Sequence, residues 1–183
     1  MDIIRLINKA LSDEDIVTVL CADTQIIKYS ELRHIDDLDE LLTNNIDYCI
    51  ILYEDRPDRG HWTALSRYNG IYEHFDSYGN KPDKSLEWVN MKMRRMLKQA
   101  TPYLTNLLNN KHYIYNNVKY QDRDGYVNTC GSHGVHRLYR LKNDGMDLQT
   151  YYNHMKHIKG RVRRQLRYNR CRVRQQVVLK LCS

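Results

Sequence analysis

Two of the three residue types of a nucleophilic triad occur at positions that the local sequence brings together. His61 opens one apolar segment, Asp76 ends the next, and Asn69-Gly70 lies between the two segments. Asn-Gly is the strongest two-residue signal for a β-hairpin, so the sequence predicts that His61 and Asp76 lie on neighbouring strands. A carboxylate beside an imidazole provides the base and the orienting group of a triad.

Cys130 would supply the nucleophile, because Asn128-Thr129 can cap a helix that starts at about residue 130. A thiol at a helix N-terminus meets the positive end of the helix dipole, which lowers the thiol pKa. Gly131 adds no side chain and lets a substrate backbone approach closely. Gln121 offers an amide donor for a developing oxyanion, beside the backbone N–H of Cys130, and Asn128 is the alternative donor.

The elements that position these residues follow from hydrophobic spacing and turn signals. We expect strands over residues 16–20, 47–53, 61–68, 71–76 and 111–121, and helices over residues 2–11, 30–42, 86–99, 130–141 and 146–158. The nearly continuous apolar run at 47–53 predicts a strand covered on both faces. The sequence has no internal repeat or low-complexity linker, and it predicts one α+β domain over residues 1–158 followed by a basic extension over 159–183.

The composition is that of a soluble globular protein, since 42% of the 183 residues are hydrophobic and 28% are charged. No apolar run approaches the ~20 residues that span a bilayer, so we expect no membrane partner. The N-terminus lacks the charged and then apolar layout of a secretion signal. Five cysteines without a C-x-x-C pair argue against a disulfide framework and a zinc ribbon, so we expect reduced thiols in an intracellular setting.

Positive charge is concentrated towards the C-terminal end. Ten of the 29 Lys and Arg residues lie in 156–180 and all 22 Asp and Glu residues precede it, which leaves 19 bases against 22 acids in residues 1–155. One interpretation is an amphipathic helix that docks on the domain. A second is sequence-independent attachment to double-stranded DNA. The arginines that would contact phosphate are Arg161, Arg163, Arg164, Arg167, Arg170, Arg172 and Arg174. A third is that residues 177–183 activate the protein or are removed by autoprocessing.

Taken together, the chemical motifs resemble those of a known family. The motifs, in chain order, are Gly60-His61-Trp62, Phe75-Asp76 with Tyr78-Gly79, Gln121, and Thr129-Cys130-Gly131. They resemble the signature of adenovirus-type and Ulp1-like cysteine proteases, and the likeness covers roughly residues 10–145. It is strongest to the virus-encoded maturation proteases of adenoviruses, virophages and large DNA viruses.

The resemblance implies a papain-like α+β fold of the adenovirus protease type, with a mixed sheet flanked by helices. It implies Cys130 as the nucleophile, with Gln121 in the oxyanion hole. His61 would be the general base and Asp76 its orienting group. Trp62 would line a substrate groove that favours small residues, commonly glycine, before the cleaved bond. Substrates would be viral capsid or core precursors, cleaved in the virion or the infected cell, with no cofactor required for the chemistry and DNA as an activator.

Other interpretations of the same residues stay open. Taken alone, His61 is an ordinary strand histidine and Cys130 a small buried apolar residue. We predict no metal site, although helical spacing could place together the metal-binding side chains of Cys130, His133 and His136, or of His154 and His157. The alternative functions are a deconjugase of ubiquitin-like modifiers and a non-catalytic DNA-binding core protein on an inactive protease scaffold.

Overall fold

The computed structural model describes residues 11–20, 24–42, 47–121 and 129–159. The chain divides into two units, Met1–Gly145 and Met146–Ser183. The expected domain boundary after residue 158 stays a prediction. No helix among the described residues combines the length and the apolar character that crossing a membrane requires.

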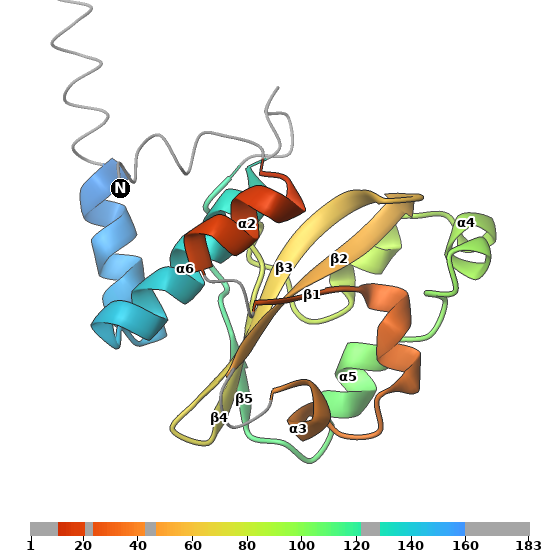
Figure 1. Cartoon of the computed structure of the whole chain (residues 1–183), viewed down its shortest axis with the longest axis horizontal. Helices are drawn as coiled ribbons and strands as arrows, with labels where there is room; N and C mark the ends of the chain where they lie inside the picture. Colours follow the sequence, from red (N-terminus) through yellow and green to blue (C-terminus); the bar gives the residue numbers. More distant parts are fainter. Residues whose placement is uncertain (1–10, 21–23, 43–46, 122–128, 160–183) are drawn as a thin grey trace, which may run out of the picture. The chain divides into compact units, whose positions relative to one another are not determined.

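A mixed sheet of five strands forms the centre of the first unit (Figure 1). In spatial order the strands are β1 (Gln25–Lys28), β2 (Tyr48–Arg56), β3 (Arg59–Tyr68), β4 (Ile71–Phe75) and β5 (Tyr113–Tyr115). The β2–β3 and β3–β4 pairs are antiparallel, whereas β1 and β5 run parallel to β2 and β4. The expected α+β class, with a mixed sheet flanked by helices, is therefore confirmed.

Helical segments surround this sheet. They are α2 (Asp13–Leu20), the 3₁₀ helix η1 (Tyr29–His34), α3 (Leu38–Leu41), the 3₁₀ helix η2 (Lys84–Trp88), α4 (Met91–Met96), α5 (Tyr103–Leu108) and α6 (Cys130–Asp144). Helix α6 confirms the helix expected from residue 130. In the second unit, residues 148–159 are helical, as the spacing over 146–158 predicts.

The β3–β4 hairpin forms where Asn-Gly predicts it. Asn69 and Gly70 have φ values of 51° and 75°, and positive φ at both positions is what a tight two-residue hairpin turn requires. The register pairs Ala64 with Phe75, the last residue of β4. Asp76 therefore emerges beside the N-terminal half of β3.

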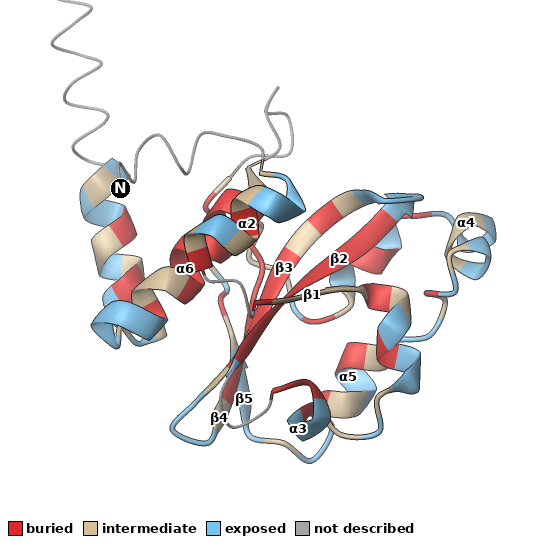
Figure 2. Cartoon of the chain, in the orientation of Figure 1, coloured by how far each residue is buried: buried red, intermediate tan, exposed pale blue. Residues whose placement is uncertain are grey.

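Strand β2 is covered on both faces, as its apolar run predicts, and Figure 2 shows it buried along most of its length. One face carries Cys49 and Ile51, which belong to the core shared with η1, α3 and α5. The other face lies under α6, where a Cβ on Gly134 would touch Ile50 and Ala64 at 3.6 and 3.7 Å. These are ordinary van der Waals distances, so the helix packs directly on the sheet at this position.

A buried ion pair joins α6 to the sheet. Arg137 Nε and Nη2 each donate to a carboxylate oxygen of Glu73 on β4, at 2.6 Å in both cases. Arg137 is completely buried and Glu73 almost so. Two parallel bonds of this kind fix geometry as well as distance. The pair thus links the helix that begins at Cys130 to the strand that leads to Asp76.

Residues 16–20 belong to helix α2, so the strand expected there is wrong. The Asp15 backbone N–H donates to Ser12 Oγ at 3.2 Å, and the Ser12 N–H donates to the Asp15 carboxylate at 3.1 Å, which caps the helix. Three acidic residues in the first turn suit the positive end of the helix dipole. Ile16 and Leu20, four residues apart, bury one face. These signals outweigh the β-branched residues that indicated a strand.

Two expected helices are each divided in two. Segment 30–42 forms η1 and α3, because Asp37 is extended and its side chain accepts the backbone N–H two residues later, at 2.8 Å, to start a new helix. Segment 86–99 forms η2 and α4, with Asn90 accepting the backbone N–H three residues later, at 3.0 Å. In both cases a capping side chain restarts the helix within a pattern that hydrophobic spacing alone reads as continuous.

The remaining differences concern length and number of elements. Only β5 is a strand within the segment 111–121, where a longer strand was expected. Strand β1 and helix α5 were not predicted. The helix expected over 2–11 lies almost entirely outside the described residues.

Candidate active site

His61 and Asp76 lie together in the β3–β4 hairpin, as their positions around the turn predict. His61 Nε2 lies 2.9 Å from Asp76 Oδ1. Both side chains are buried, that of Asp76 completely. Because the carboxylate engages Nε2, the second ring nitrogen, Nδ1, is the one that can face a nucleophile.

Asp76 is held by the loop that follows it. Its Oδ1 also accepts the backbone N–H of Tyr78 at 2.8 Å, and its Oδ2 accepts from Asn80 Nδ2 at 3.0 Å and from Ser85 Oγ at 3.2 Å. Burial alone would raise the pKa of this carboxyl, but the attraction of His61 and the hydrogen bonds lower the pKa to about 2. Asp76 is therefore a fixed negative charge.

Asn116 is a positioning residue that the sequence did not reveal. Its Oδ1 accepts the Asp76 backbone N–H at 2.7 Å, and its Nδ2 donates to the Asp76 carbonyl at 2.7 Å. Nδ2 also donates to the Val118 carbonyl at 3.0 Å. Asn116 directly follows β5, so this amide connects the end of β5 to the end of β4. A neutral amide 40 residues away carries no local signal of that role.

Cys130 is the first residue of α6 and only 4% of its surface is exposed. The backbone N–H of Trp62 donates to its Sγ at 3.4 Å. The sulfur also lies close enough to the His61 imidazole for each group to shift the pKa of the other. The predicted grouping of Cys130, His61 and Asp76 is thus present, with the imidazole between the sulfur and the carboxylate.

The charges of Asp76, His61 and Cys130 shift the pKa values of their neighbours in this group. Burial by itself lowers the pKa of His61, but the Asp76 carboxylate and the Cys130 sulfur raise that pKa to about 9. Burial likewise raises the pKa of the Cys130 thiol, whereas hydrogen bonding and attraction from His61 give a net lowering below its ordinary value. A thiolate–imidazolium pair is the form that these directions favour near neutral pH.

Gln121 lies at the N-terminal end of α6. Its Oε1 accepts from Thr129 Oγ1 at 2.9 Å, which ties the amide to the residue before Cys130. The structure thus places Gln121 next to the residue before the sulfur, and its role as an oxyanion donor stays a prediction. Asn128, the alternative donor, lies outside the described residues.

Gly131 has a packing role next to Trp62. A Cβ at position 131 would lie 3.2 Å from Cδ1 of the Trp62 indole, which is closer than ordinary van der Waals contact. Glycine therefore lets this indole lie against the first turn of α6. The indole is only half-buried, so Trp62 lies at the surface beside the sulfur.

Two further aromatic rings, for which the sequence predicts no role, lie against His61. The centroid of the His61 ring lies 4.9 Å from that of Tyr78 and 5.2 Å from that of Trp88. Tyr78 and Trp88 meet edge to face at 5.1 Å. They restrict rotation of the imidazole and form a wall on its outer side, where 37% of Trp88 is exposed.

The alternative ligand set of Cys130, His133 and His136 does not come together as a metal site. In the described ranges 11–20, 24–42, 47–121 and 129–159, no three His, Cys, Asp or Glu side chains form a group that could hold a metal ion. His136 Nε2 instead accepts from Arg140 Nε at 3.3 Å. The seven arginines predicted to contact DNA, Arg161 to Arg174, lie outside the described residues.

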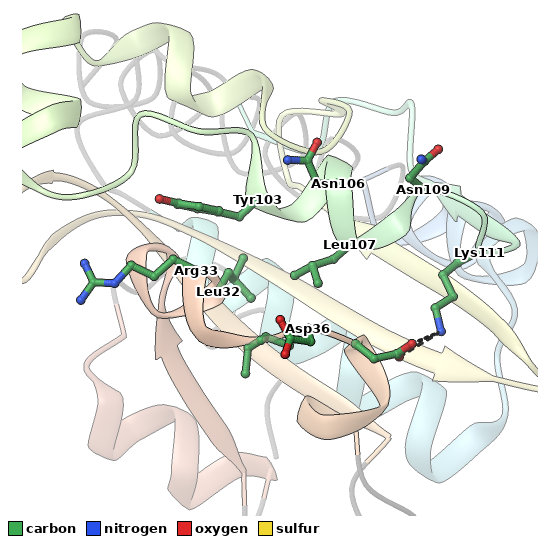
Figure 3. Close-up of a pocket in the computed structure, with 10 residues that line it drawn as sticks. Leu32, Arg33, Asp36, Tyr103, Asn106, Leu107, Asn109 and Lys111 are labelled. Carbon is green, nitrogen blue, oxygen red and sulfur yellow. Dashed lines mark hydrogen bonds and ion pairs between the residues drawn. The ribbon is translucent and has the colours of Figure 1, made fainter.

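A hollow elsewhere in the first unit carries none of these residues (Figure 3). It lies between η1 and α5, and Arg33, Tyr103, Asn106 and Lys111 are among its lining residues. Lys111 Nζ is bound to both carboxylate oxygens of Asp37, at 2.8 and 2.9 Å. The cation is therefore already neutralised, and nothing in the hollow resembles the chemistry around Cys130.

Comparison with known proteins gives one relative. The uncharacterized protein V9 of Sputnik virophage is 34% identical over 153 residues, which covers 78% of this chain and 87% of V9. No protein-family profile matches the chain. No solved structure matches it either.

Proposed function

The chain belongs to the same family as protein V9 of Sputnik virophage, and from this kinship and the site we propose that it is a virus-encoded cysteine endopeptidase. Its substrates would be capsid or core precursor proteins, cleaved during virion maturation in the particle or the infected cell. A papain-like fold of the adenovirus protease type, with the chain order His61, Asp76, Gln121 and Cys130, is part of the proposal.

The observation that carries the proposal is the line of contacts from Cys130 through His61 to Asp76. A buried thiol whose pKa is lowered by a neighbouring imidazole, which a carboxylate orients, is an activated nucleophile. A merely structural cysteine would show the opposite shift, as Cys49 does, where burial raises the thiol pKa.

In the proposed reaction, the Cys130 thiolate attacks the carbonyl carbon of the substrate peptide bond. Gln121 and the Cys130 backbone N–H would donate to the resulting oxyanion. The C–N bond breaks as the His61 imidazolium passes its Nδ1 proton to the leaving amine. Water then attacks the thioester and gives a proton to Nδ1, and the carboxyl product leaves as the thiolate reforms.

None of these steps requires a bound metal or organic cofactor. Duplex DNA acting through Arg161 to Arg174 would serve as an activator rather than as a participant in bond breaking. Trp62 would line the groove for the residues before the cleaved bond, beside Gly131.

The test is thiol alkylation at about pH 6, where ordinary thiols are protonated and react slowly. Wild type and His61→Ala are treated with iodoacetamide, and the modified cysteines are located by mass spectrometry. We expect rapid modification of Cys130 that is lost in His61→Ala, with Cys49 as the internal control. Capsid and core precursors from the same genome are then incubated with wild type and with Cys130→Ala. Equal cleavage by the two proteins, or a Cys130 no more reactive than Cys49, would refute the proposal.

A further inference from the structure

Exposed apolar side chains are concentrated next to the aromatic wall of the site. Among the described residues, six large apolar side chains are exposed, and three of them are Trp88, Met91 and Met96, at 37%, 46% and 59%. Large exposed apolar groups gathered within nine residues of sequence mark an interaction surface more often than isolated ones do.

Helix α4 presents these methionines together with cations. Met91, Lys92, Arg95 and Met96 are exposed, whereas the two residues between them are half-buried. Residues four apart share one face of a helix, so Met91 lies beside Arg95 and Lys92 beside Met96. We call these four residues together with Trp88 the α4 surface.

The α4 surface carries an unbalanced positive charge. Neither Lys92 nor Arg95 forms an ion pair with a described residue, and the sequence from 88 to 121 contains no Asp or Glu. Glu87, the nearest preceding carboxylate in sequence, is bound by Lys84 at 2.6 Å. A partner for this surface must therefore bring its own negative charge.

The position of Trp88 next to His61 indicates which part of a substrate would contact the α4 surface. The Trp88 ring lies 5.2 Å from that of His61. In cysteine-protease chemistry the imidazolium protonates the leaving amine, so the groups around it lie on the C-terminal side of the cleaved bond. The other residues of the α4 surface begin three positions after Trp88, at Met91.

We propose that the α4 surface binds a segment of the substrate that lies C-terminal to the cleaved bond and contains both acidic and apolar residues. The inference rests on the proposed function and adds a substrate preference to it. Lys92 and Arg95 contact the carboxylates, and Met91 and Met96 adapt to the apolar side chains, as flexible thioethers do.

The apolar content of the surface favours a peptide over a nucleic acid. Phosphate attachment depends on many cations and gains little from exposed methionines. Two cations beside three apolar side chains, of which Trp88 lies against His61, suit an acidic and apolar peptide segment.

The experiment is cleavage profiling with a proteome-derived peptide library, read by mass spectrometry. Wild type is compared with the double variant Lys92→Glu/Arg95→Glu and with Met91→Ser/Met96→Ser. We expect wild type to enrich Asp and Glu after the cleaved bond, and the charge-reversed variant to lower cleavage of those peptides by roughly two- to tenfold, as exposed ion pairs allow. The serine variant should lose the apolar preference and keep the acidic one.

Two controls isolate the surface from the chemistry. Arg33→Glu reverses an exposed charge on η1 and should leave the profile unchanged. A coumarin amide of the preferred N-terminal-side sequence lacks the C-terminal segment. Both variants of the α4 surface should therefore cleave it at the wild-type rate. The affinity of the Lys92→Glu/Arg95→Glu variant for duplex DNA is measured in parallel.

The outcomes separate the inference from the proposed function. Cleavage without an acidic preference, or an equal loss on the coumarin amide, overturns the inference and leaves the endopeptidase. Reduced DNA affinity with an unchanged cleavage profile makes the surface a nucleic-acid contact and also overturns it. A peptide library that stays uncleaved, together with an unreactive Cys130, would refute both the inference and the proposed endopeptidase activity.

Discussion

Burial lowers the pKa of His61, but the Asp76 carboxylate on one side and the Cys130 sulfur on the other raise that pKa to about 9. The elevated imidazole pKa and the lowered thiol pKa define a pH window in which the base is already protonated and the nucleophile already ionised. The Cys130 thiolate is lost at the acidic end of this window, and the His61 imidazolium is lost at the basic end.

Peptide cleavage and alkylation should therefore respond differently to high pH. We expect kcat/KM for cleavage to fall as pH rises through about 9, because His61 loses the proton that the leaving amine needs. Alkylation of Cys130 needs only the thiolate and should not fall there. Both rates are measured from about pH 5 to about pH 10. A cleavage rate that keeps rising above pH 9 would contradict the assignment of His61.

Replacing Asp76 by Asn should lower the pKa of His61. The charge that offsets burial is removed, while the amide keeps the shape of the side chain. Each pKa unit by which the thiolate–imidazolium pair is destabilised lowers the thiolate fraction about tenfold. We therefore expect alkylation of Cys130 at about pH 6 to slow by roughly tenfold or more. Ser85→Ala, which removes a neutral donor to the same carboxylate, should have a much smaller effect. Equal effects of the two would indicate that Asp76 acts only through packing.

Residue types and local spacing were enough to predict that His61 and Asp76 are neighbours and that a helix begins at Cys130, because a hairpin turn and a helix start are local signals. The residues that hold Asp76 were not predictable in this way. Ser85 and Asn116 lie nine and 40 residues from Asp76 in the chain, and each is a neutral polar residue without a pattern. Their roles depend on where the loop after β4 and the end of β5 pass.

At the level of elements, the buried pair of Glu73 and Arg137 fixes α6 against β4. Removing one partner leaves a buried charge unpaired, so we expect Arg137→Met to lower the free energy of unfolding by about 3–5 kcal/mol. The double variant Arg137→Met/Glu73→Leu should recover much of that loss. Denaturant unfolding measures all three proteins. Lys84→Met, which breaks an exposed pair with Glu87, should cost no more than about 1 kcal/mol.

That experiment also asks whether the pair positions the site. A double variant that regains stability but alkylates Cys130 slowly would show that the two bonds set the height of α6 relative to the hairpin. A double variant with wild-type stability and wild-type reactivity would make the pair structural only.

Elements with strong local signals were predicted well, and those decided by capping were not. The strands around Asn69-Gly70 and the apolar run of β2 were confirmed. Helix α2 was mistaken for a strand, because five β-branched or aliphatic residues were weighed above the Ser12 cap and the acidic first turn. Strand β1 has only four residues, too few for alternation to stand out.

For the molecule as a whole, the concentration of positive charge in residues 159–183 predicts that DNA binding can be separated from the reactivity of Cys130. Deleting residues 159–183 should leave the iodoacetamide reactivity of Cys130 intact, because the described site lies within residues 61–131. Binding to duplex DNA should weaken, and its dependence on salt should flatten, since fewer phosphates are neutralised. Filter binding over a range of salt concentrations provides the measurement. An unchanged salt slope would rule out the extension as the DNA contact.

The small exposed fraction of Cys130 also bears on inhibitor chemistry. With 4% of the residue exposed and the Trp62 indole beside it, steric access rather than nucleophilicity should distinguish electrophiles. A slim warhead such as a nitrile or chloroacetamide can reach the sulfur, whereas a bulky N-aryl maleimide meets the aromatic rings first. Selectivity over exposed thiols of other proteins would then come from the width of the warhead.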